Sequence, residues 1–268
     1  MALSHKSLAL LAGIGLLAGA VGCDIQVKDG KTSFELNTPQ ATQQWDRQYP
    51  LAPGGQIEVA NLNGPIEVSQ GPAGTVEIQA VITAKSMSED QANDILLKGK
   101  ITEDISPDRV KVETVIPRGV RGSYEVRYRV RAPADAVTTL STTNGSVKAE
   151  GLGGSLKASV VNGSLELTDI GGAVDAAAVN GPLSAKLSKV TAAVRLETTN
   201  GRLNLQLPGS SKADLSARVV NGGLNISGFA VENPRGTRIR NLDTRLNGGG
   251  PKIDLRTTNG RITITGVP

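Results

Sequence analysis

Short segments in which apolar and polar residues alternate recur along most of the chain, and they predict β-strands. In such a segment every second side chain points to the same face, so alternation places the apolar ones in a core and the polar ones in solvent. One half-unit of this pattern is nine residues long. Its apolar positions are Val147/Ala149, Leu156/Ala158/Val160, Leu165/Leu167, Val174/Ala176/Ala178, Leu183/Ala185/Leu187, Val194/Leu196, Leu203/Leu205/Leu207, Leu224/Ile226, Ile253/Leu255 and Ile262/Ile264.

The dipeptide Asn-Gly separates these segments at a regular spacing. From Asn144 to Asn221 its asparagines stand 18, 18, 20 and 21 residues apart, and Asn259 follows 38 residues later, or two steps of 19. Gly adopts a positive φ at no steric cost and Asn is the next most tolerant residue, so we expect a sharp corner at each dipeptide. The predicted corner residues are Asn63, Asn144, Gly145, Asn162, Gly163, Asn180, Gly181, Asn200, Gly201, Asn221, Gly222, Asn259 and Gly260.

Two topologies are compatible with this pattern. One is an antiparallel meander with Asn-Gly in type I′ hairpin turns. The other is a β-solenoid of stacked coils, each about 18–20 residues long. A Gly-Gly pair at 153–154 and again at 171–172 marks a second type of corner midway between Asn-Gly corners, which favours the solenoid. We expect residues 187–192 and 208–212 to bulge out at corners, and residues 229–247 to form a loop or an irregular coil.

The N-terminal part of the chain differs from the repeats. Residues 23–48 are mostly polar and are predicted to form a tether. Residues 49–133 are predicted to form a β region, in which 110–115 and 124–130 pair as a hairpin. Ser88 to Lys98 is the one helix candidate, because Ser88 can cap it and Glu89 and Asp90 suit its positive end. Residues 134–268 would form the solenoid, and Trp45 and Tyr49 are interpreted as packing residues.

The first 22 residues have the parts of an export signal. His5 and Lys6 begin it, residues 8–17 are apolar apart from glycines, and small residues lead to Cys23. The apolar stretch is shorter than the roughly 20 residues that a membrane-spanning helix needs, so a cleavable signal fits better. Small residues directly before a cysteine resemble the bacterial lipobox, although Ala20 stands where Leu is usual. We therefore expect lipid attachment at Cys23 and a place in the cell envelope; the alternative is an ordinary cleavage site beside an unmodified cysteine.

Composition narrows the chemistry that the chain can perform. Its single histidine, His5, lies in the signal, and Cys23 is its only cysteine. Catalytic triads and His or Cys metal sites are therefore excluded from the mature chain, and we expect no cofactor. The formal net charge is +4 with basic and acidic residues interleaved, so no nucleic-acid partner is expected. The chain has six aromatic residues (one Trp, three Tyr and two Phe), and so the core must be aliphatic.

Three segments together resemble a known family. Residues 57–68 (IEVANLNGPIEV) are similar to its opening motif, residues 124–133 (YEVRYRVRAP) to the strand before its repeats, and the Thr-Thr-Asn-Gly and Val-Val-Asn-Gly units to the repeats themselves. The family is that of the DUF4097 β-strand repeat proteins, often labelled "putative adhesins", and the resemblance covers residues 49–268. It implies an all-β, right-handed β-solenoid at the cell envelope without an established active site.

Three functions compete on these grounds. The first is a non-catalytic, membrane-anchored lipoprotein that presents its solenoid for adhesion, scaffolding or interaction with a surface polymer or envelope protein. The second is a self-assembling polymer, because open solenoid ends are edge strands and the strand at Ile262 and Ile264 ends the chain with no visible cap. The third is a polysaccharide-active enzyme, which needs paired carboxylates. The candidate acids for that role are Glu150, Glu166, Asp169, Asp175 and Glu197.

Overall fold

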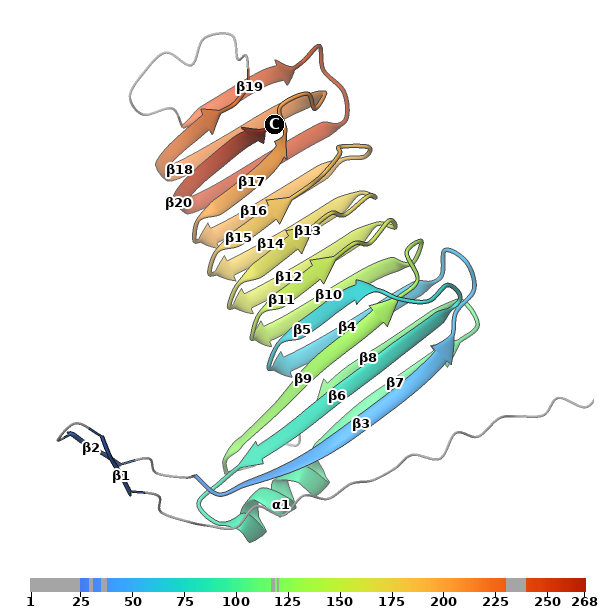
Figure 1. The fold of residues 1–268 in the computed structure, drawn as a ribbon, viewed down its shortest axis with the longest axis vertical. Helices are drawn as coiled ribbons and strands as arrows, with labels where there is room; N and C mark the ends of the chain where they lie inside the picture. The colour runs from blue at the N-terminus through green and yellow to red at the C-terminus, as the bar shows by residue number, and fades with distance from the viewer. Residues whose placement is uncertain (1–24, 29–30, 35–37, 117–118, 120, 230–239) are drawn as a thin grey trace, which may run out of the picture.

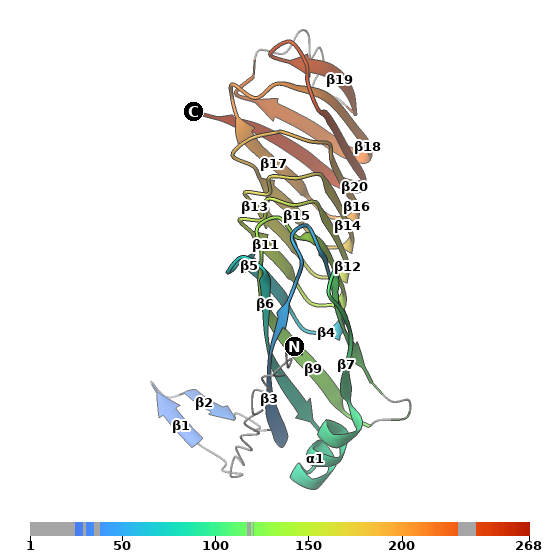
Figure 2. The ribbon, with the colours of Figure 1, turned by 90° about the vertical axis from the view of Figure 1, so that its right-hand side faces the viewer.

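The computed structural model describes residues 25–28, 31–34, 38–116, 119, 121–229 and 240–268. Apart from the small hairpin of β1 (Ile25–Lys28) and β2 (Lys31–Phe34), these residues form a stack of strands with two opposite faces (Figures 1 and 2). Face A consists, in spatial order, of β7 (Lys100–Ser106), β8 (Arg109–Val115), β4 (Gln56–Asn63), β10 (Val137–Asn144), β12 (Leu156–Asn162), β14 (Val174–Asn180), β16 (Val194–Asn200), the first halves of β20 (Lys252–Val267) and β18 (Ala213–Ser227), and β19 (Asn241–Leu246).

Face B runs alongside face A. Its strands in spatial order are β3 (Gln40–Pro50), β6 (Thr75–Lys85), β9 (Ser123–Ala132), β5 (Ile66–Gln70), β11 (Val147–Glu150), β13 (Leu165–Thr168), β15 (Leu183–Lys186), β17 (Leu203–Pro208), and the second halves of β20 and β18.

Each coil of the stack contributes one strand to face A and one to face B. From the coil of β4 and β5 onward, successive coils pair in parallel with no shift in register: Leu140 lies beside Ala158, and Ala158 beside Ala176. Parallel pairing of every coil with the next is the arrangement of a β-solenoid, and it excludes the antiparallel meander. The solenoid prediction is therefore confirmed for the described part of the chain.

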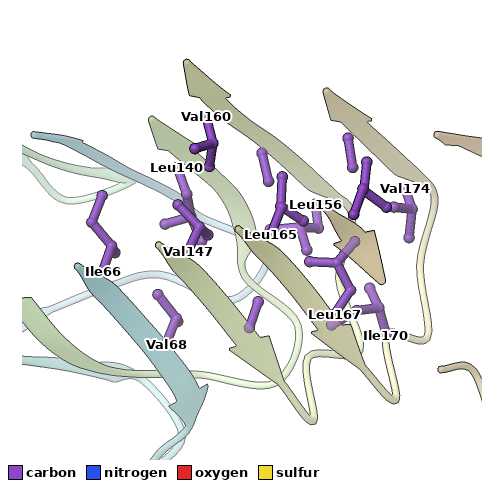
Figure 3. Close-up of a cluster of buried hydrophobic side chains, with 14 of the residues drawn as sticks. Ile66, Val68, Leu140, Val147, Leu156, Val160, Leu165, Leu167, Ile170 and Val174 are labelled. Carbon is purple, nitrogen blue, oxygen red and sulfur yellow. The ribbon is translucent and has the colours of Figure 1, made fainter. Parts of the chain in front are cut away.

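The hydrophobic core is the thin space between the two faces. Figure 3 shows inward side chains from both sheets meeting there, among them Leu156 and Val160 from face A and Leu165 and Leu167 from face B. All four are at most 2% exposed. The alternation seen in the sequence is thus the alternation between core and solvent, and small residues such as Ala158 and Ala176 keep the layer thin.

The N-terminal strands close one end of this core. β3, β6 and β9 pair antiparallel, and helix α1 (Glu89–Lys98) packs below them (Figure 1). As predicted, Ser88 caps the helix: its hydroxyl accepts a hydrogen bond from the Gln91 backbone N–H at 3.3 Å. The edges of the two faces are joined by Tyr49, whose hydroxyl donates to Glu103 Oε2 at 2.5 Å, and by the ion pair of Arg47 with Glu103 at 3.6 Å.

Two expectations for this region need correction. β3 begins at Gln40, inside the range assigned to the tether, because its inward side chains cover the edge of the core: Ala41 and Tyr49 are buried and Trp45 packs against them. The interpretation of Trp45 and Tyr49 as packing residues is confirmed. The hairpin of 110–115 with 124–130 is wrong, because β8 pairs with β7 and β4 on face A, whereas β9 pairs with β6 and β5 on face B.

The order of coils at the C-terminal end also differs from the expectation. β20 lies between β16 and β17 on one side and β18 on the other, and it is parallel to both. The strand at Ile262 and Ile264 is therefore interior, not an uncapped end, and residues 208–212 form a crossover past the inserted coil rather than a simple bulge. On face A the stack ends in β19, which pairs antiparallel with β18. The expected irregular region thus contains a regular strand over Asn241–Leu246.

Two tyrosines at the closed end of the core differ in whether their buried hydroxyls form a hydrogen bond. The Tyr128 hydroxyl lies 2.8 Å from the Thr114 hydroxyl, so the two residues form a hydrogen bond across the core between face B and face A. Tyr124 is 2% exposed, and its hydroxyl is the buried side-chain polar atom that lacks a hydrogen-bond partner among the described residues. Burial raises the pKa of Tyr124 to about 12.

We expect removal of the two hydroxyls to change the free energy of unfolding differently. Tyr128→Phe should lower the free energy of unfolding by about 1–3 kcal/mol, because the buried Thr114 hydroxyl loses its partner. Tyr124→Phe should leave it unchanged or raise it by about 1 kcal/mol, because it removes a polar atom that is buried without a bond. Urea denaturation of both variants measures this, and an equal loss in both would contradict the assignment.

The raised pKa of Tyr124 also predicts a dependence on pH. Its folded pKa of about 12 exceeds the ordinary value of 10.0, so the free energy of unfolding is undiminished below about pH 10 and falls as the pH rises through 12, because the hydroxyl ionises more easily in the unfolded chain. Urea midpoints measured across this window should fall less steeply for Tyr124→Phe than for the unmodified protein. Identical slopes would show that the Tyr124 hydroxyl does not remain buried and neutral in the folded state.

Candidate functional site

The Asn-Gly corners form a continuous ladder along one edge of the stack. Each asparagine after Asn63 donates a hydrogen bond from its side-chain amide to the amide oxygen of the asparagine in the neighbouring coil, at 2.8–2.9 Å. Asn63 itself donates to the Tyr124 carbonyl at 3.2 Å. In spatial order the ladder is Asn63, Asn144, Asn162, Asn180, Asn200, Asn259 and Asn221. All seven predicted corners therefore lie together, although Asn259 precedes Asn221 in space.

The glycines of these corners are required for a reason that the sequence did not indicate. A Cβ atom on Gly181 would lie 1.9 Å from the carbonyl oxygen of Gly163 in the neighbouring coil, and one on Gly260 would lie 1.8 Å from that of Gly201. Positive φ is only part of the cause, since the φ of Gly181 is 148° whereas Gly201 and Gly260 are not among the positive-φ residues. Close approach of successive backbones is the common constraint.

Buried threonines support the same corner from inside. The Thr142 hydroxyl donates to the Gly64 carbonyl at 3.2 Å, and the Thr198 hydroxyl donates to the Gly181 carbonyl at 3.2 Å. In the coil of β4 and β5, the Asn61 side-chain amide donates a hydrogen bond to the Gly64 carbonyl of its own corner at 3.0 Å. The ladder thus joins neighbouring coils, and its amide groups form hydrogen bonds mainly with one another.

The candidate acids do not form a catalytic pair. Glu150 and Glu166 point outward from face B, whereas Asp175 and Glu197 point outward from face A, and Asp169 lies at a corner with a φ of 53°. Glu197 is paired with Arg195 at 3.1 Å, and Glu150 lies 3.8 Å from Lys148. Within the described residues no group of three or more His, Cys, Asp or Glu side chains could hold a metal ion.

Face A carries a groove that crosses the coils at the ends of the strands opposite the Asn ladder. Its volume is about 450 Å³, and it extends over β10, β12, β14, β16 and β20. Small residues, Ser155, Ala173 and Ala193, precede three of these strands and line the groove. Because neighbouring strands are about 4.8 Å apart, the groove runs along the stack for roughly 19 Å.

Charged side chains of alternating sign line the groove. Lys157, Asp175, Arg195 and Asp254 follow one another across four neighbouring coils. Asp254 is held by a two-pronged ion pair with Arg256, with both contacts at 3.1 Å, and this bonding raises the pKa of Arg256. Arg195 stands between Asp175 and Asp254 in register and pairs with Glu197 at 3.1 Å, so the two acids are not neighbours across the strands.

The groove was not predicted, and Asp254 was not among the candidate residues. The available signal was the small residue that stands directly before the first inward residue in successive repeats, as in Ser155-Leu156, Ala173-Val174 and Ala193-Val194. Only stacking without a register shift brings these small side chains into one line.

A second hollow, of about 440 Å³, lies on face B near the N-terminal strands. Its charges are already paired within the protein: Arg131 contacts Glu77 at 2.9 Å and Arg129 contacts Glu67 at 3.4 Å. The groove on face A crosses five strands of the repeat, whereas this hollow crosses only β5 and β11 of it, so the groove is the better candidate for binding an extended ligand. In the described part of the chain no helix has the length and apolar character to cross a membrane. Cys23 and the predicted signal over residues 1–22 lie outside the described residues.

The fold and its surface define a two-faced β-solenoid with a corner ladder and one groove across its coils. By sequence, residues 19–265 match the family described as Toastrack DUF4097, and the chain belongs to that family. The predicted family is thereby confirmed.

One solved structure agrees with this fold. The crystal structure of "a putative cell adhesion protein" from Clostridium sporogenes is similar with a TM-score of 0.51 and 14% identity, over 84% of this chain and 100% of that chain. A "putative adhesin" from Bacteroides fragilis aligns with a TM-score of 0.35 and 13% identity, over 84% of this chain and 97% of that chain. At such identities the first likeness shows the fold alone. No curated protein matches the sequence significantly.

The close backbone approach at the corners predicts a large effect of a single methyl group. Gly181→Ala should lower the free energy of unfolding by about 1–3 kcal/mol or more, because the new Cβ meets the Gly163 carbonyl. Gly223→Ala is the matched control: it lies beside the Asn221 corner, but no atom is within 4 Å of its Cβ position. Urea denaturation should separate the two variants, and similar midpoints would refute the steric account of the corner.

Proposed function

We propose that the protein is a non-catalytic binding module of the cell envelope, which uses the groove on face A to hold an extended surface polymer. The observation that carries this proposal is the groove itself, a continuous depression across five coils of a stacked, hydrogen-bonded scaffold. The solved structure of similar fold carries the name "putative cell adhesion protein", which supports a role in adhesion or scaffolding. Because the coils repeat at a constant distance, the groove offers equivalent positions to a ligand that itself repeats.

The charge pattern of the groove restricts the ligand. Acidic Asp175 and Asp254 alternate with basic Lys157 and Arg195, so a polyanion such as a nucleic acid would meet a like charge at every second coil. A polymer rich in hydroxyl groups avoids this repulsion, because a hydroxyl donates to carboxylates and accepts from ammonium and guanidinium groups. We therefore assign the groove to an uncharged or weakly charged polysaccharide of the envelope.

Anchoring at Cys23 completes the proposal. Lipid chains on this residue would hold the protein at a membrane outside the cytoplasm, since two or more acyl chains suffice for stable attachment. Helix α1 and the long strands β3, β6 and β9 form the end of the stack that follows the tether in sequence, and face A with its groove extends beyond them (Figure 1).

Binding is tested by filling the groove. Ala173→Trp should weaken co-sedimentation with insoluble envelope polysaccharide at least tenfold, because the indole occupies space that the polymer needs. Ser184→Trp is the matched control: it places the same side chain outward on β15, on the opposite face. If both variants sediment like the unmodified protein, the groove is not the binding surface.

Anchoring is tested separately from binding. The mature protein should have the intact mass of a chain that begins at an acylated Cys23 and should fractionate with membranes. Cys23→Ser should remain unprocessed or be released in soluble form. A soluble, unacylated product cleaved elsewhere would remove the anchor from the proposal and leave the test of the groove unaffected.

A further inference from the structure

The insertion of β20 makes the C-terminal coil a separable part of the solenoid. Its neighbours on both sides, β16 and β17 below and β18 above, precede it in the chain, so they form a slot that β20 fills. Within this slot β20 pairs with β18 from Lys252 to Thr265. From β10 to β17 each coil stacks on the coil that precedes it in sequence, whereas β20 lies between two coils that both precede it.

The slot is specific for the sequence of β20. Ile253, Leu255, Ile262 and Ile264 are all 0% exposed and complete both sheets of the core. Asn259 continues the corner ladder by donating to Asn200 and accepting from Asn221, at 2.8 and 2.9 Å. A strand that fills the slot must therefore carry inward aliphatic residues on both sides of an Asn-Gly corner. Every copy of this chain supplies such a strand.

The connection to β20 has the composition of a hinge. Residues 247–251 read Asn-Gly-Gly-Gly-Pro and join β19 to β20. They have to pass β18, a distance of roughly 10 Å at two strand spacings, whereas the six steps from Leu246 to Lys252 can extend to roughly 20 Å. Gly248 and Gly249 have φ values of 92° and 86° in the closed form, and glycine can leave these values for an extended conformation without steric cost.

The contacts that keep the hinge closed are few and polar. The Asn247 side-chain amide donates to the carbonyls of Gly209 and Ser211, both at 2.9 Å, and so clips the hinge to the crossover between β17 and β18. This explains why Asn247, which is also followed by a glycine, is absent from the ladder. Opening the hinge costs these bonds, whereas all contacts of β20 can be formed again in an identical slot.

From these observations we infer that two copies of the chain exchange their C-terminal coils, so that residues 252–267 of each fill the slot of the other. A reciprocal exchange of this kind closes on itself as a two-fold dimer and reuses the contacts of the monomer. It differs from an open polymer, because the outer strands of both stacks remain as they are in the monomer. The inference does not depend on the ligand of the groove.

Disulfide trapping between different chains tests the exchange. Asn204 and Thr263 face outward as register neighbours on β17 and β20. In a Cys23→Ser background, chains with Asn204→Cys are unfolded, mixed with chains carrying Thr263→Cys, and refolded together at high protein concentration. Exchange should produce a disulfide-linked heterodimer, because the two thiols meet only when one chain fills the slot of the other. Chains with Thr168→Cys, on β13 and away from the slot, replace the Asn204→Cys chains as the control.

The length of the hinge provides a second test. Deletion of residues 248–251 should make the dimer the main species in light scattering, because the two steps that remain between Leu246 and Lys252 extend to roughly 7 Å and cannot pass β18 within one chain. Insertion of two further glycines into the hinge of the unmodified protein should instead favour the monomer. The inference is overturned if the heterodimer does not exceed the Thr168→Cys control after co-refolding, and a deletion variant that stays a folded monomer by circular dichroism overturns it independently.

Discussion

The close approach of successive backbones at the Asn-Gly corners is the constraint on which the rest of the structure depends. A Gly carbonyl of one coil lies where a Cβ of the next would be, so each coil can stack on its neighbour only with glycine above glycine. That contact fixes the register to the residue. A slip of one position would turn every inward Leu, Val and Ala to the solvent, and so the corner also maintains the core.

The fixed register then determines what the surface can do. Side chains at equivalent positions of successive coils form straight columns, whether the column is the amide ladder, the small residues of the groove or the alternating charges beside it. Opposite charges at register positions of neighbouring coils, such as Asp175 beside Arg195, avoid the repulsion that like charges would cause there. In the proposed function, the same alternation selects the polymer that the groove binds, so that stability and recognition would share one geometric property.

The edge strands at the two ends of the stack are arranged differently. At the N-terminal end, antiparallel strands and helix α1 cover the core, and Tyr49 and Glu103 join the two faces. At the C-terminal end the chain places its last coil inside the stack and leaves β18 and β19 outside. The terminal coil is thereby protected on both sides, whereas an exposed parallel edge would be open to pairing with other chains.

The sequence by itself determined the strands and corners of the repeats, the helix with its cap and the family, because alternation, spacing and capping are local properties of the chain. Asn63, Asn144, Asn162, Asn180 and Asn200 could be identified as equivalent for that reason. The tertiary structure alone decided that Asn259 precedes Asn221 in space and that Asn247 clips a hinge, since the spacing of 38 residues fits sequential and inserted coils equally well. It also decided the groove, because Ser155, Ala173 and Ala193 become neighbours only when coils stack in register.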